Sequence, residues 1–77
     1  MGQIVTFYDA NHRMLGRYAA RGDLDIALFF SDWVTATLRE RGLVVQPVIS
    51  EDNIEAKYHW PSLTPVIESL TQKLREN

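Results

Sequence analysis

The sequence predicts an α+β fold of order ββαββα, with two layers: a mainly antiparallel four-stranded sheet and two helices on one of its faces. Three observations lead to this fold. A long helix-periodic segment covers residues 23–42, and strand-like segments stand in pairs before and after it, at 3–8, 14–20, 43–49 and 54–60. A second amphipathic helix begins at Thr64-Pro65. Short connections between consecutive elements favour antiparallel neighbours.

Length and composition narrow the class of protein. A chain of 77 residues predicts one compact domain over 1–77. The absence of cysteine excludes disulfides, thiolate zinc sites and cysteine nucleophiles, and it favours a cytoplasmic location. A net charge of −2 disfavours nucleic acid as a partner, and no apolar run is long enough for a membrane span, so we expect no membrane partner.

The first two strands are expected to form a hairpin with a loop at 9–13. Pairing Tyr8 with Met14 and alternating from there predicts which side chains share a face. The expected core face carries Ile4, Tyr8, Met14 and Tyr18. The expected outer face carries Val5, Phe7 and Leu15 beside a row of arginines, Arg13, Arg17 and Arg21.

The segment 23–42 has residues typical of a helix start and a helix end. Asp23 is expected to cap its start, and Gly42 is expected to end it in a left-handed conformation after Arg39 and Arg41. At about 100° per residue, its apolar arc covers roughly 200°, which is wider than the ~100° stripe of an ordinary surface helix.

Two interpretations of this wide arc stay open. In the first, the helix is central, with the sheet on one flank and the second helix on the other, so its aromatic residues belong to the core. In the second, Phe29, Trp33 and Leu28 reach past the core and contact a partner, because buried aromatic side chains dominate interface energetics.

The third strand is expected at the edge of the sheet, and the fourth strand carries a second candidate surface. Pro47 cannot donate to a ladder, so 43–49 is expected to lie at an edge or to be interrupted at Pro47, and a polar turn is expected at 50–53. Residues 54–60 alternate, with Trp60 on the apolar side. Trp60 is therefore either core or a rim residue that touches a partner.

The sequence predicts no catalytic residue, metal site or cofactor. His12 and His59 are the only histidines, and neither lies in a metal-ligand pattern. An enzyme or enzyme subunit that uses one of them is the third hypothesis. Single-stranded nucleic-acid binding across an open sheet face, through Arg13, Arg17 and Arg21, is the second.

The leading hypothesis is a small non-enzymatic protein–protein interaction module of the adaptor or inhibitor type. Its partner is another protein or, in a homodimer, a second copy of the chain. The residues expected to bind that partner are Phe29, Trp33 and Leu28 on the helix, Arg13 and Arg17 as a polar patch, and Trp60.

Overall fold

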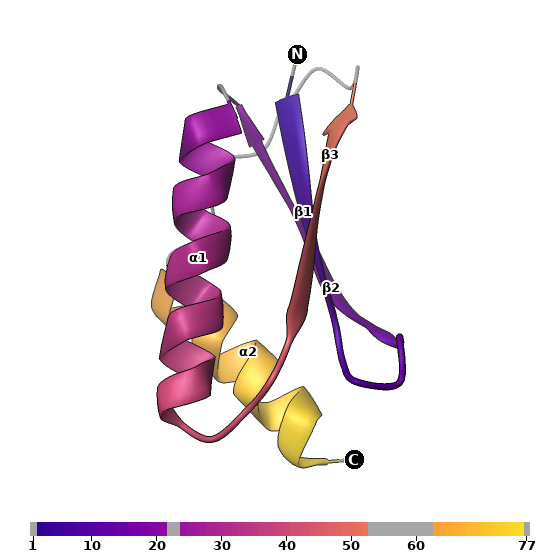
Figure 1. The fold of residues 1–77 in the computed structure, drawn as a ribbon, viewed down its shortest axis with the longest axis vertical. Helices are drawn as coiled ribbons and strands as arrows, with labels where there is room; N and C mark the ends of the chain where they lie inside the picture. The colour runs from indigo at the N-terminus through magenta and orange to yellow at the C-terminus, as the bar shows by residue number, and fades with distance from the viewer. Residues whose placement is uncertain (1, 22–23, 53–62, 77) are drawn as a thin grey trace.

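The computed structural model describes residues 2–21, 24–52 and 63–76. In chain order the elements are β1 (Gly2–Tyr8), β2 (Met14–Arg21), α1 (Leu24–Glu40), β3 (Gln46–Asp52) and α2 (Leu63–Arg75). The strands form one sheet in the order β2-β1-β3, and both pairings are antiparallel. Both helices lie on the same side of this sheet (Figure 1).

The prediction of a four-stranded sheet is wrong, because the sheet has three strands. The proposed fourth strand, 54–60, lies outside the described residues, as do His59 and Trp60. The third strand also begins later than expected, at Gln46, and residues 50–52 continue it instead of turning. The chain first uses Leu43 to close the end of α1, since the Leu43 N–H donates to the Leu38 carbonyl at 2.9 Å.

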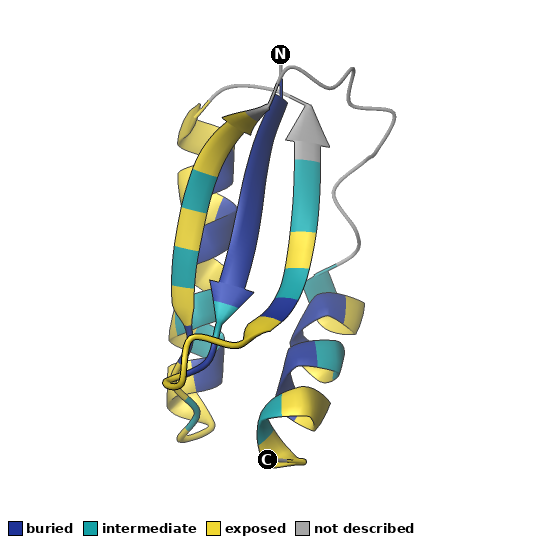
Figure 2. Ribbon diagram, turned by 90° about the vertical axis from the view of Figure 1, so that its right-hand side faces the viewer, coloured by how far each residue is buried: buried dark blue, intermediate teal, exposed yellow. Residues whose placement is uncertain are grey.

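β1 is the central strand and holds both neighbours along its whole length. Pro47 pairs with Phe7 at the sheet edge, which confirms the expected edge position of this proline. Figure 2 shows β1 buried over nearly its full length between the two edge strands. The helices lie behind the sheet in that view, α1 against β1 and β3 and α2 against β2.

The β1–β2 hairpin is confirmed, but its register is not the simple alternation that the sequence suggested. Tyr8 does oppose Met14, yet the next pairs are Phe7 with Gly16 and Val5 with Tyr18. Leu15 is the extra residue of a bulge, and one extra residue moves all later side chains to the other face.

The expected core face is therefore only partly right: Tyr18 packs against the core and Ile4 is buried, but the buried cluster lies on the face of Val5 and Phe7. Val5 and Phe7 are fully buried on the helix side, whereas Met14, which was expected in the core, is 59% exposed. Leu15 was expected on the outer face, but it is buried in the core.

Three aromatic rings form the centre of the core: Phe7 from β1, Tyr18 from β2 and Phe30 from α1. Their centroids are 5.9–6.0 Å apart, and the ring planes meet at 62–65°. This edge-to-face geometry sets positive ring edges against negative ring faces. The remaining buried members of the core are Val5, Leu15, Ala27, Val34, Leu38, Val45, Val66, Ile67 and Leu70.

The end of α1 matches the sequence, whereas α2 begins at Leu63, one residue before the expected start at Thr64. Gly42 has a φ of 77°, and its N–H donates to the Arg39 carbonyl at 2.9 Å, which confirms the left-handed stop. Asp23, the expected cap, lies outside the described residues. The amphipathic character expected of the second helix is confirmed, with Val66, Ile67 and Leu70 buried.

The hairpin loop is held by the side chain of Asp9. Its Oδ1 accepts the N–H groups of Asn11 at 2.8 Å and Arg13 at 3.0 Å. His12, rather than Asn11, takes the left-handed conformation, with a φ of 63°. The buried Asp9 carboxylate is therefore satisfied by backbone donors and serves the turn.

Gly16→Ala should destabilise the protein by about 1–3 kcal/mol, because a Cβ at Gly16 would stand 2.9 Å from the Tyr18 Oη. Tyr18 cannot swing away freely, since its ring packs against Phe7 and Phe30. Chemical denaturation of both proteins measures the difference. Equal unfolding free energies would contradict the close approach.

The stability of the protein should fall as the pH rises above 10.0, partly through Tyr18. Burial raises the pKa of Tyr18 above its ordinary 10.0, and a hydrogen bond with Ser69 opposes that shift. As the pH rises, the hydroxyl of Tyr18 therefore loses its proton first in the unfolded chain. The contribution of Tyr18 to the free energy of unfolding is full below pH 10.0 and is lost at higher pH. Tyr18→Phe should lose less stability over the same range in pH-dependent denaturation. An unchanged slope would exclude this role.

Candidate protein-binding surface

α1 is apolar on two sides. Its inner side is core, with Ala27, Phe30, Val34 and Leu38 buried. Its other sides expose five large apolar side chains: Leu24 (50%), Ile26 (46%), Leu28 (42%), Phe29 (68%) and Trp33 (38%). Single exposed apolar residues are ordinary, but five on one helix make a candidate interaction surface.

Helical spacing divides these five residues into two groups. Ile26, Phe29 and Trp33 follow each other at i, i+3 and i+7, so they share one side, which we call the α1 stripe. Leu24 and Leu28 are one turn apart on the other flank. Phe29 and Phe30 are adjacent in sequence and differ most in exposure, at 68% and 3%. Phe30 fills the core, and its neighbour is left on the surface.

The α1 stripe borders a groove between α1 and α2. One hollow of about 180 Å³ is lined by four apolar residues, Ile26, Phe29, Phe30 and Leu63. Further along the helices, a smaller hollow of about 90 Å³ is lined by Trp33, Thr37, Arg41, Thr64, Ile67 and Glu68. The groove is therefore apolar at the start of both helices and becomes polar towards the end of α1.

The polar end of the groove is closed by contacts between the helices. The Arg41 Nη1 donates to the Thr71 Oγ1 at 3.2 Å and lies 3.8 Å from the Glu68 Oε1. The Arg41 and Glu68 side chains are 38% and 65% exposed, so this ion pair is a surface pair of small energetic value. Its main effect is to fix the end of α1 against α2.

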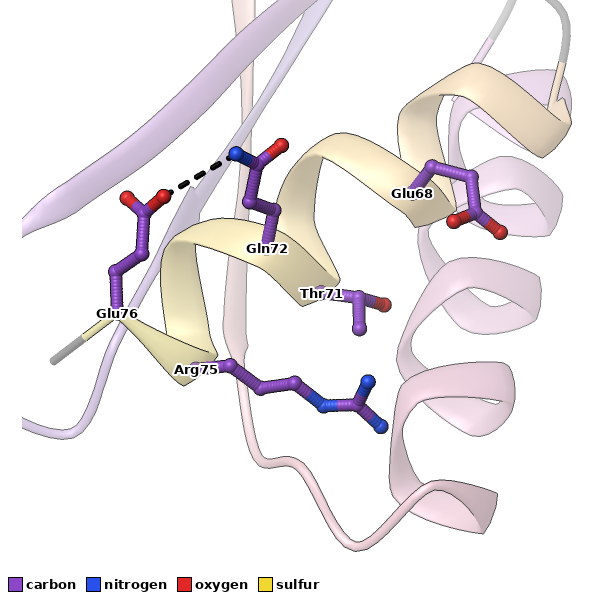
Figure 3. Close-up of a pocket in the computed structure, with 5 residues that line it drawn as sticks. All are labelled: Glu68, Thr71, Gln72, Arg75 and Glu76. Atoms are coloured by element: carbon purple, nitrogen blue, oxygen red, sulfur yellow. Dashed lines mark hydrogen bonds between the residues drawn. The ribbon is translucent and has the colours of Figure 1, made fainter.

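A third hollow, of about 360 Å³, lies beside α2 (Figure 3). In the close-up, Glu68 and Thr71 point towards α1, while Gln72 and Glu76 point away from it. The Gln72 Nε2 donates to the Glu76 Oε1 at 3.2 Å, a pairing of residues four apart on one helix. Glu68 and Thr71 instead contact Arg41 across the helix pair.

The structure brings only part of the predicted binding set together. Phe29, Trp33 and Leu28 are all exposed on α1. Arg13 lies in the hairpin loop, and Arg17 pairs with Thr6, so it faces away from the helices. The expected combination of aromatic anchors and arginines on one surface is therefore not formed. Trp60 lies outside the described residues.

The structure separates Phe7 from the arginines beside which it was expected. Phe7 is fully buried on the helix side of the sheet. Arg17 is exposed on the outer face, and Arg21 lies at the end of β2 opposite Gly2.

The histidine hypothesis gains no supporting geometry from the described part of the chain. His12 is an exposed loop residue. No group of three or more His, Cys, Asp or Glu side chains that could hold a metal ion occurs in 2–21, 24–52 and 63–76. Within the same residues, neither helix combines the length and apolar character that crossing a bilayer requires.

Sequence reasoning missed two residues of this surface. Ile26 was not among the residues expected to bind a partner, but it is 46% exposed at the edge of the groove. Leu24 was not selected, although its i, i+4 spacing from Leu28 was visible in the sequence.

Comparison with protein-family models, with curated proteins and with solved structures finds no match.

The adjacent residues Phe29 and Phe30 offer a matched test of this surface. Phe29→Ala should change the unfolding free energy by less than about 0.5 kcal/mol, because most of its ring is already in water. Phe30→Ala should cost about 3–5 kcal/mol, because it empties the centre of the core. Urea denaturation of the two variants measures both values. A large loss for Phe29→Ala would show that this ring serves the fold rather than a partner.

Proposed function

We propose that the protein is a non-enzymatic protein-binding domain, of adaptor or inhibitor type, that binds through the α1 stripe and the apolar part of the adjoining groove. The observation that carries this proposal is Phe29, which is 68% exposed on a 17-residue helix. The helix is held rigidly, since Phe30, Val34 and Leu38 anchor its other side in the core. Binding therefore requires no ordering of a loop, which would weaken the affinity.

The chemistry of the surface supports a protein partner. Covering one exposed Phe side chain is worth about 1.5–3 kcal/mol when its burial is complete. Phe29 and Trp33 are of the type that supplies most interface energy, and the apolar hollow beside them can receive an apolar side chain. Exposed charges such as Asp25, Asp32 and Arg39 form a polar rim around this centre.

Affinity capture with matched variants tests this function. Bait proteins carrying Phe29→Glu or Val48→Glu are compared with the unmodified chain in extract of the native host. Val48 is a suitable control because it is 50% exposed and pairs with Thr6, on the sheet face away from the helices. We expect proteins retained by the unmodified chain and by Val48→Glu to be lost with Phe29→Glu.

Circular dichroism first establishes that both variants are folded. If the three baits retain the same proteins, identified by mass spectrometry, α1 is not the binding surface. If folded baits retain nothing and the purified chain is also monomeric, the proposed function is wrong.

A further inference from the structure

We infer that the partner on the α1 stripe is a second copy of this chain, with its α1 lying antiparallel to the first. This inference rests on the proposed function, because it uses the same surface. It adds the identity of the partner, its orientation and the stoichiometry.

The shape of α1 is self-complementary. Phe29 and the exposed Ala36 are seven residues apart, so they point in nearly the same direction from the helix. A two-fold axis placed at Trp33 sets Phe29 of one copy beside Ala36 and Thr37 of the other. The large side chain of one helix then meets small side chains of its neighbour, as knobs-into-holes packing requires. The two Trp33 rings come together at the centre.

The charges of α1 favour the antiparallel orientation. Its amino-terminal half carries Asp25 and Asp32, both exposed, and no basic residue. The carboxyl-terminal end, residues 39–41, carries Arg39, Glu40 and Arg41, which sum to one positive charge. In an antiparallel pair about Trp33, Asp25 lies near Arg39 of the second copy, on the same flank of the stripe. Arg41 lies on the other flank, where it contacts Thr71 and Glu68 of α2. A parallel pair would set Asp25 against Asp25, a repulsive contact.

The helix ends and the symmetry support the same arrangement. Antiparallel helices place the positive end of one macrodipole beside the negative end of the other. A two-fold contact of this kind uses the same patch on both copies, so association ends at the dimer. Both copies of Phe29 and Trp33 are then covered at once.

Sedimentation equilibrium on the purified chain tests the stoichiometry. With increasing concentration, the mass should rise from 8.9 kDa towards twice that value. Phe29→Glu should weaken the dimer at least about 30-fold, the equivalent of losing about 2 kcal/mol from an anchor residue. Val48→Glu should behave as the unmodified chain does.

The orientation is tested with one engineered cysteine, since the chain has none of its own. Leu24→Cys carries a spin label at the start of α1, on the flank outside the stripe. In the antiparallel dimer, the two labels are offset by about 27 Å along the helix axis, the length of 18 residues. In a parallel dimer they lie side by side. Pulsed electron paramagnetic resonance measures this separation.

Each result decides the inference. A mass of 8.9 kDa at all concentrations, a dimer that Phe29→Glu leaves intact, or labels side by side would overturn it. A monomeric chain that still loses a different captured protein in Phe29→Glu would leave the proposed function standing. A monomer without any variant-sensitive capture would refute both.

Discussion

The bulge at Leu15 is the constraint on which the rest of the structure depends. Because β2 contains one extra residue there, Tyr18 pairs with Val5 and joins Phe7 on the helix side of the sheet. Phe30 of α1 completes the ring cluster, and its ring contacts fix how α1 is rotated about its own axis. With Phe30 turned inwards, Phe29 must point elsewhere, since adjacent helical residues are about 100° apart. A local irregularity in a strand thus determines which face of a distant helix is exposed.

α1 carries more large apolar side chains than its inner side can bury. Its inner side covers β1 and β3, and its flank lies against α2. Among the described residues, α2 lies beside that flank, and its Leu63 lines the hollow next to Ile26 and Phe29. The apolar side chains that remain outside are the reason for assigning the helix a role in binding.

The two interpretations of the wide apolar arc are partly compatible. Trp33 lines a hollow with Ile67 and Thr64 of α2 and is 38% exposed, so it belongs to the helix–helix contact and to the surface. Phe29 has no comparable share in the core. The arginines and these aromatic residues were expected to bind the same partner. The fold separates the two sets, because Arg17 of β2 points to the opposite side of the sheet.

The sequence by itself determined the elements whose signals are local. Gly42 ends α1 because glycine, having no Cβ, enters the left-handed region at little cost, and the spacing of Val66, Ile67 and Leu70 sets the buried side of α2. Pro47 likewise marked β3 as an edge strand. Tertiary structure decided which sheet face is core, since the register shift after Tyr8 depends on pairing between strands and leaves no pattern in either strand alone. The tertiary structure also decided that Phe30 is buried and Phe29 is exposed. The sequence gives the width of the apolar arc, but not how much of that arc the sheet and α2 cover.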